Sequence, residues 1–182
     1  MISYKRNQQF TEEYPVKEAK KILNKIIIGV ADMQVSDDPN VELVTYSLGS
    51  CLGLVIYDPR VKVGGIAHIM LPESKIEQKK VIENPFKFVD TGIPLLFKAA
   101  YALGAKKSRL IVKGAGCGRV LNDSNLFNIG QRNEGALRKL LWKNNVLLKV
   151  TDFGGNISRT IRLRIGDGTL LVRYNRALEK AL

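Results

Sequence analysis

The sequence is poor in the residues that build disulfide scaffolds and metal sites. Its 182 residues include two cysteines, Cys51 and Cys117, and one histidine, His68. A disulfide scaffold needs more cysteines, and a structural zinc site needs four Cys or His ligands, more than this chain can supply. Chemistry that uses an imidazole must therefore use His68, and we expect no zinc site.

Long apolar runs and a recognisable leader are also lacking. A transmembrane helix needs roughly 18 or more successive apolar residues, and the runs here, such as Cys51–Tyr57, are far shorter. Met1–Glu13 has no apolar core of the kind found in signal peptides. Apolar residues make up 45% of the chain, too many for a disordered protein. These features predict a folded cytoplasmic protein with reduced thiols and no membrane insertion.

Acidic residues are few relative to basic ones. The chain has 29 Lys and Arg against 17 Asp and Glu, which gives a formal net charge of +12. Such a charge favours acidic partners, among them nucleic acids, anionic membrane surfaces and acidic proteins. The basic residues are spread along the chain, however, and no nucleic-acid-binding motif accompanies them. We therefore expect no nucleic-acid partner, and an ordinary solvated basic surface remains an alternative.

The chain divides into an extension and one domain. Residues 1–27 form the predicted N-terminal extension, and residues 28–182 form a domain of ordinary size. Within the extension, apolar residues recur every three or four positions over Tyr14–Ile28, which predicts a partly helical segment. Such a helix can pack on its own domain or lie on a membrane surface.

Strand and helix patterns alternate within the domain. Helices are predicted over Asp90–Leu103 and over Ile129–Lys143, and Asn128 is positioned to cap the second. The segments with strand-like patterns are Ile26–Met33, Val41–Tyr46, Cys51–Tyr57, Val61–Leu71, Arg109–Lys113, Val146–Thr151 and Thr169–Tyr174. Strands interleaved with two main helices indicate a single α/β (α+β) domain with a mixed sheet.

A cysteine stands directly after a glycine-containing turn, at the start of an apolar strand. Gly49 and Ser50 precede Cys51. A glycine here lets the backbone turn sharply and direct amide N–H groups into a cavity. Amides placed in this way would stabilise a developing oxyanion. We therefore predict backbone oxyanion donors at Gly49 and Ser50.

Hairpin geometry brings this cysteine near the histidine. The turn signal Asp58–Arg60 predicts a hairpin between the two flanking strands. With Pro59-Arg60 at its tip, Cys51 lies directly opposite His68, and directly opposed Cβ atoms are about 5 Å apart. A longer loop or a bulge would shift this register.

A Cys–His pair is typical of nucleophilic catalysis. A neighbouring imidazole lowers the pKa of a thiol and holds the thiolate as an ion pair, and a third group usually orients the imidazole. The residue types alone leave alternatives open. Cys51 can be a small core residue and His68 a hydrogen-bonded core histidine. Cys117, within the glycine-rich segment Gly114–Gly118, is a rival nucleophile.

Several motifs stand in a fixed order over about Ile28–Arg173. They are TxxLGSC at Thr45–Cys51, YDP at Tyr57–Pro59, GGIAHxMLP at Gly64–Pro72, NIGxRN at Asn128–Asn133 and DxGGN at Asp152–Asn156. Together they resemble the CheD family, bacterial chemotaxis proteins that deamidate glutamines on chemoreceptors. The resemblance implies a layered α/β/β domain and a protein-glutamine glutaminase, an amidohydrolase that acts on side-chain amides. It also implies that Cys51 is the nucleophile, His68 its partner and Thr45 the third site residue, with no cofactor.

The resemblance also implies partners. These are methyl-accepting chemoreceptors, whose helical cytoplasmic parts carry the glutamines, and a CheC-like phosphatase where one is present. A basic face would meet acidic receptor helices well. The same machinery could hydrolyse a glutamyl methyl ester, because the acyl intermediate is identical. The alternative function is a non-catalytic adaptor that binds a CheC-type phosphatase or the receptor.

The sequence departs from the family pattern at three places. They are the extension of residues 1–27, the segment Gly114–Val120 and Phe153, which stands where a small polar residue is usual. The last two could reshape the rim of the pocket or the partner surface. All three expected site residues are present, so we expect an active enzyme.

Overall fold

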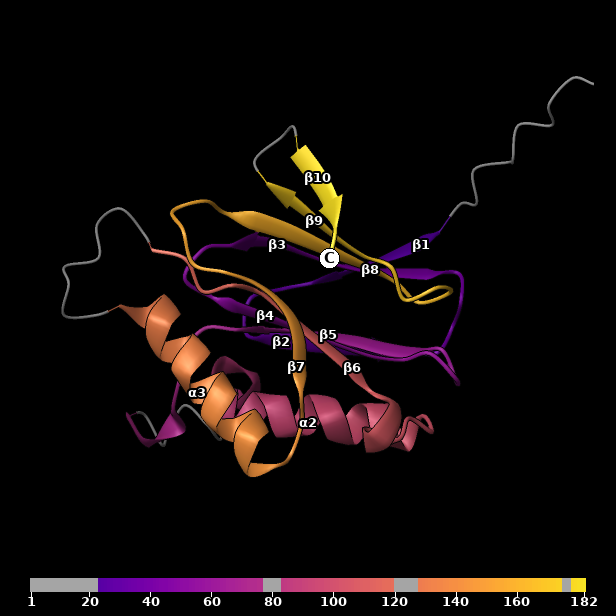
Figure 1. Cartoon of the computed structure of the whole chain (residues 1–182), viewed down its shortest axis with the longest axis horizontal. Helices are drawn as coiled ribbons and strands as arrows, with labels where there is room; N and C mark the ends of the chain where they lie inside the picture. The colour runs from indigo at the N-terminus through magenta and orange to yellow at the C-terminus, as the bar shows by residue number, and fades with distance from the viewer. Residues whose placement is uncertain (1–22, 77–82, 120–127, 175–177) are drawn as a thin grey trace, which may run out of the picture.

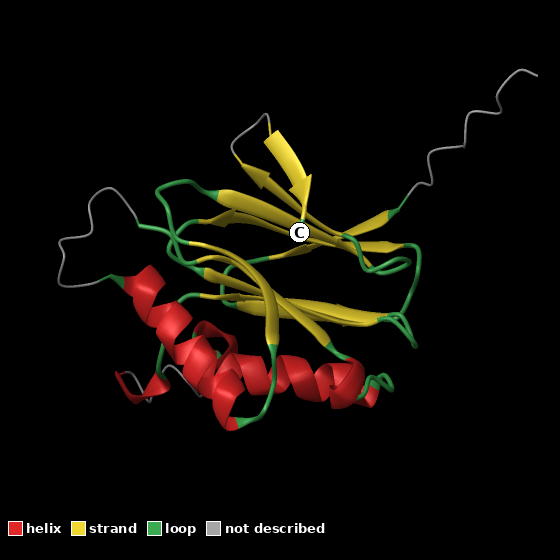
Figure 2. Cartoon of the chain, viewed as in Figure 1, coloured by secondary structure: helices red, strands yellow, loops and turns green. Residues whose placement is uncertain are grey.

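The described part of the protein folds into three layers: a helical layer with two main helices, a central sheet and an outer sheet (Figures 1 and 2). The computed structural model describes residues 23–76, 83–119, 128–174 and 178–182. The layered α/β/β architecture with two main helices, expected from the resemblance, is confirmed.

The helical layer consists of α2 (Val89–Ala102) and α3 (Ile129–Lys143). Short 3-10 turns are η1 (Ser74–Ile76), η2 (Pro85–Lys87) and η3 (Lys107–Arg109). The strands are β1 (Asn24–Ile28), β2 (Asp32–Ser36), β3 (Val41–Leu48), β4 (Leu52–Asp58), β5 (Val63–Ile69), β6 (Ile111–Gly116), β7 (Leu148–Phe153), β8 (Arg159–Arg164), β9 (Leu170–Tyr174) and β10 (Leu178–Ala181). Within the described ranges, no helix is long and apolar enough to cross a membrane.

Both sheets are mixed. The outer sheet has the strand order β1-β3-β8-β9-β10, and the central sheet has the order β2-β5-β4-β6-β7. Each contains one parallel pair, β1 with β3 in the outer sheet and β6 with β7 in the central sheet. The other neighbouring strands run antiparallel.

The central sheet is covered on both faces, which explains the apolar character of β4 and β5. Every residue of both strands is buried. Leu52, Leu54 and Ile56 face the core beneath the helices, whereas Val55 and Ile66 face the core between the two sheets. A strand buried on both faces reads as a continuous apolar run, and this is why the pattern predicted both strands.

The N-terminal boundary needs correction. Asn24–Ile28 forms strand β1, which pairs in parallel with β3, and the residue before it is not helical, so the helix predicted over Tyr14–Ile28 is wrong over residues 23–28. The rest of that helix, up to residue 22, lies outside the described residues. Edge pairing with β3, together with the β-branched run Ile26–Ile28, favours the strand. The packed domain therefore starts before residue 28.

The single strand predicted over Ile26–Met33 is two strands. The chain turns at Val30 and Ala31, where Ala31 has a left-handed φ of 55°. Before the turn the chain belongs to the outer sheet as β1, and after it the chain belongs to the central sheet as β2. This turn links the two sheets close to the site described next.

Candidate active site

Thr45 and His68 meet in the space between the two sheets, and Cys51 packs against the core of the same space. Residues along β5 alternate in direction, so that Ile66 and His68 face the outer sheet while Ala67 and Ile69 face the helices. Thr45 reaches His68 from β3 of the outer sheet. Cys51, immediately before β4, is half-buried against the same inter-sheet core.

Thr45 joins His68 to the backbone by two hydrogen bonds. Its hydroxyl oxygen lies 2.9 Å from the carbonyl oxygen of Ile28 and 2.8 Å from Nδ1 of His68. A carbonyl can only accept, so Thr45 donates its single proton to Ile28 and must accept from His68 Nδ1–H. The neutral imidazole therefore carries its proton on Nδ1 and a lone pair on Nε2. An Nε2 lone pair can act as a general base.

This Nε2 atom is buried and has no hydrogen-bond partner in the described part of the chain. A buried nitrogen without a partner carries a desolvation cost. The atom is thus ready to accept a proton from a group that enters the site or from the neighbouring thiol.

The predicted hairpin register is wrong by two residues. Asp58 pairs with Val63, so the loop has four residues instead of two, and His68 stands opposite Gly53 instead of Cys51. Because the shift is even, Cys51 and His68 remain on the same face of the sheet. The two residues are diagonal neighbours, a relation that long side chains can bridge.

The resting site carries neutral groups. Burial raises the pKa of the Cys51 thiol above its ordinary value and lowers the pKa of His68 to about 4. Desolvation disfavours the charged form of each group, so both are neutral at pH 7. These shifts favour a neutral thiol and a neutral imidazole over the predicted thiolate–imidazolium ion pair. The arrangement instead supports transfer of the thiol proton to Nε2 during attack.

The turn that carries the cysteine is held by hydrogen bonds to its carbonyl groups. Each carbonyl of Gly49–Cys51 accepts a hydrogen bond: Gly49 from Gly118 N at 2.7 Å, Ser50 from Asn133 Nδ2 at 3.1 Å, and Cys51 from Cys117 N at 2.8 Å. A trans peptide is planar, and its C=O and the following N–H point in opposite directions. The amides of Ser50 and Cys51 therefore point away from these partners.

The Gly49 amide is in a different position. Its N–H already donates to the Ser47 carbonyl at 2.9 Å. Of the two amides predicted as oxyanion donors, Gly49 is thus engaged within the turn. The geometry favours the amides of Ser50 and Cys51.

Cys117 does not share the site with Cys51. Although it stands across from Cys51, its backbone is left-handed at φ 53° and its side chain lies in the core beneath the helices. Burial foremost, with Glu134 and Cys51 adding to it, raises the pKa of Cys117 to about 12. A thiol held this firmly in its protonated form is a poor nucleophile.

One buried residue at this site escaped prediction. Asn133 on α3 is fully buried and donates to two carbonyls beside the cysteine and histidine strands. The buried residues of α3 are Gly130, Asn133, Leu137 and Leu141. A polar residue on the apolar face of a helix is the signal that could have identified it.

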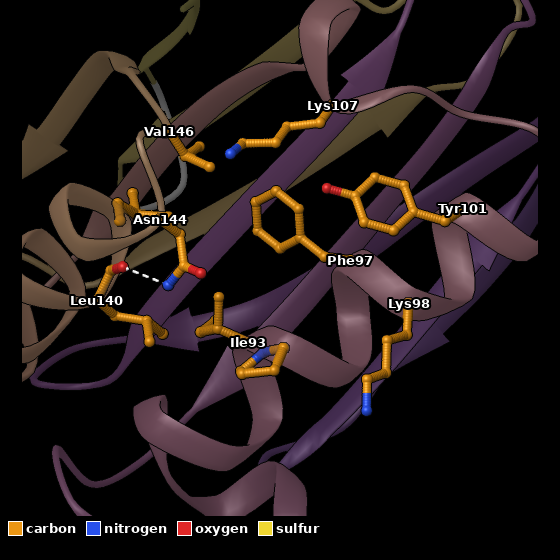
Figure 3. A pocket seen from close by; sticks show the side chains of 10 residues that line it. Ile93, Phe97, Lys98, Tyr101, Lys107, Leu140, Asn144 and Val146 are labelled. Carbon is orange, nitrogen blue, oxygen red and sulfur yellow. Dashed lines mark hydrogen bonds between the residues drawn. The ribbon is translucent and has the colours of Figure 1, made fainter.

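A separate groove lies on the helical side of the molecule, between α2 and α3 (Figure 3). It has a volume of about 320 Å³, and Ile93, Phe97 and Leu140 form much of its apolar wall. Its lining includes two lysines, Lys98 and Lys107, but no cysteine, histidine or carboxylate. The groove therefore lacks a nucleophile and a general base of the kind found between the sheets.

Comparison with known proteins identifies relatives that match most of the chain. The profile of the CheD family, described as CheD chemotactic sensory transduction, matches residues 70–174. A protein of Syntrophus aciditrophicus named probable chemoreceptor glutamine deamidase CheD 1 is 50% identical over 151 residues, which are 83% of this chain and 94% of that protein. Similarly named proteins of Solibacter usitatus and Anaeromyxobacter dehalogenans are 47% and 40% identical, over 84% and 83% of this chain and 90% and 95% of their own lengths.

Proposed function

The chain belongs to the CheD family, and we propose that it is a chemoreceptor glutamine deamidase in which the Cys51 thiol is the nucleophile. The observation that carries this proposal is the hydrogen-bonded chain from Ile28 through Thr45 to His68, which leaves the Nε2 lone pair free. This is the state that a general base needs before it accepts the proton of a neutral thiol.

In the first half-reaction, Cys51 sulfur attacks the carboxamide carbon of a receptor glutamine while its proton passes to His68 Nε2. A C–S bond forms, and the carbonyl oxygen becomes an oxyanion. His68 then delivers the proton to the carboxamide nitrogen, the C–N bond breaks and ammonia leaves. The product of this half-reaction is a glutamyl thioester on Cys51.

In the second half-reaction, water replaces ammonia. His68 Nε2 accepts a proton from water as its oxygen attacks the thioester carbon, and the C–S bond breaks with return of the proton to the Cys51 sulfur. The receptor then carries glutamate, and the enzyme is restored. A glutamyl methyl ester would enter the same intermediate with methanol as the leaving group.

Two further groups support these steps. Thr45 holds the imidazole in the tautomer with Nε2 unprotonated, as the central member of the hydrogen-bonded chain. The N–H groups of Ser50 and Cys51 stabilise the oxyanion as it forms. The carbonyl groups of the same two peptides, those of Gly49 and Ser50, point the opposite way and are held by hydrogen bonds. No step requires a metal or another cofactor.

The substrate and its location follow from the function. The glutamines lie on the helical cytoplasmic part of the chemoreceptor, so the protein acts in the cytoplasm. A CheC-like phosphatase is the proposed further partner. The net charge of +12 suits association with acidic receptor helices.

The decisive experiment compares the wild type with Cys51→Ala and Cys117→Ala on a glutamine-bearing receptor cytoplasmic fragment. Mass spectrometry detects and locates each replacement of an amide by a carboxyl group. We expect modification by the wild type and by Cys117→Ala, and none by Cys51→Ala. Loss of activity in Cys117→Ala alone would overturn the assignment of the nucleophile.

The adaptor function remains the alternative. It is favoured if the wild type binds receptor or phosphatase but modifies no receptor glutamine. Alkylation of Cys51 would then leave partner binding and signalling unchanged.

A further inference from the structure

Asn133 connects helix α3 to the two segments that carry Cys51 and His68. It belongs to the second turn of α3 and is fully buried. One bond from its Nδ2 reaches the Ser50 carbonyl at 3.1 Å, and the other reaches the Met70 carbonyl at 2.9 Å. Both protons of the carboxamide nitrogen are thus used on main-chain oxygens.

These two carbonyls flank the proposed catalytic residues. Ser50 directly precedes Cys51, and Met70 follows His68 by two residues. The ladder between β4 and β5 ends at the pair Leu52 and Ile69. Asn133 therefore bridges the two strands just past the last rung, where backbone pairing has stopped.

The helix is placed to allow this contact. Gly130 lies one turn before Asn133, and a Cβ atom there would come within 2.4 Å of the carbonyl oxygens of both Cys117 and Gly118. Only glycine permits so close an approach of α3 to the segment after β6, whose amides bind the Gly49 and Cys51 carbonyls. The close approach brings the Asn133 side chain within reach of both carbonyls.

The amide is kept at a cost. Its Oδ1 atom is buried and has no partner within the described residues. A leucine of similar size would remove this unpaired oxygen and add apolar burial. A buried carboxamide whose two N–H groups are hydrogen-bonded, while its oxygen has no partner among the described residues, points to a role for the two N–H groups.

We propose that Asn133 is a positioning residue for deamidation, one that fixes the Cys51 peptide and its separation from His68. This inference rests on the proposed function. Asn133 holds the Ser50 carbonyl, and the planar peptide then directs the Cys51 N–H the opposite way, as an oxyanion donor. Its second bond holds the end of the histidine strand at a set distance from that peptide.

The first test compares Asn133→Ala and Asn133→Asp with a matched control, Asn144→Ala. Asn144 donates from Nδ2 to the Leu140 carbonyl at the other end of the same helix. We expect both Asn133 variants to lower kcat about 10- to 100-fold with KM within about twofold, because a transition-state contact is loosened. Asn144→Ala should keep the wild-type kcat.

The aspartate variant separates the donors from the shape. It keeps the size of asparagine but cannot donate when ionised. Near-wild-type kcat in Asn133→Asp would show that the donors are not needed and would overturn the proposal. So would a loss confined to KM in either variant.

The second test needs no receptor, so it separates this inference from the proposed function. Alkylation rates of Cys51 are measured in a double-mutant cycle of Asn133→Ala and His68→Ala. We expect His68→Ala to change the rate several-fold in the wild type and in Asn144→Ala, but by less than about twofold in Asn133→Ala. Additive effects would overturn the proposal even if deamidation is observed.

A measurement on the wild type covers variants that fail to fold. Nuclear magnetic resonance of the Asn133 side-chain amide should show both protons protected from exchange with solvent, as expected for buried donors bound to two carbonyls. Rapid exchange of either proton would overturn the proposed role of Asn133.

Discussion

At the scale of single residues, the direction of two hydrogen bonds decides the chemistry of the site. Thr45 has one proton to give, and the Ile28 carbonyl takes it, which leaves the Thr45 oxygen to accept from His68. A β-branched threonine in a strand is unremarkable in sequence. Its importance comes from an imidazole that a different sheet places 2.8 Å away.

We expect Thr45→Val to lower kcat by about 10- to 100-fold, less than the roughly 10⁴-fold loss when a charged aspartate partner of a catalytic imidazole is replaced, because threonine is neutral. Valine keeps the shape but cannot accept from Nδ1–H, so the imidazole loses its fixed tautomer and orientation. Thr45→Ser keeps the hydroxyl and should retain most of the activity. Deamidation rates of the purified variants check this, and equal rates for valine and threonine would contradict it.

At the scale of helices and strands, the sequence pattern predicted the two main helices more accurately than the strands. The predicted helix Ile129–Lys143 is confirmed at both ends, and the predicted Asp90–Leu103 differs from α2 by one residue at each end. Strand β8, at the centre of the outer sheet, was missed although its residues alternate between buried and part-exposed. Its exposed positions are filled by threonine and arginines, which hide a strand from a search for apolar runs.

The hairpin between β4 and β5 is anchored by Asp58, which is fully buried. Burial raises the pKa of this carboxyl, but the Arg109 guanidinium and the backbone N–H groups of Lys106 and Arg60 outweigh it and hold the pKa at about 2. The carboxylate therefore ties the hairpin loop to the segment that leads into β6.

We expect Asp58→Asn to destabilise the fold by about 3 kcal/mol, the usual cost of breaking a buried ion pair. The folded pKa lies below the ordinary value of 3.8, so this contribution is complete above pH 3.8 and is lost as the pH falls towards 2. Urea unfolding at several pH values measures it. The variant should show a shallower loss of stability in acid, and parallel pH profiles would contradict the assignment.

At the scale of the whole molecule, the net charge of +12 acts over longer distances than any contact in the site. Added salt screens such interactions between exposed charges. It has little effect on groups buried between two sheets, such as Thr45 and His68. Salt therefore distinguishes receptor association from chemistry.

We expect a rise in sodium chloride from about 0.05 to about 0.5 M to raise KM for an acidic receptor fragment several-fold, while kcat stays nearly constant. Steady-state deamidation kinetics measure both. Alkylation of Cys51 by a neutral reagent serves as the control and should not change with salt. Receptor modification that is independent of salt would show that the basic charge plays no part in association.

The sequence by itself determined the helices, the apolar central strands, the family and the residues expected to act. Each of these depends on neighbours close along the chain or on motifs that can be read in order. The tertiary structure alone decided the split of the Ile26–Met33 region between two sheets, the register of Cys51 against His68, the burial of that pair and the contacts that Asn133 makes with the Ser50 and Met70 carbonyls. These depend on which distant segments pack together and exclude water, because burial sets the pKa values and three-dimensional packing brings α3 to the two strands.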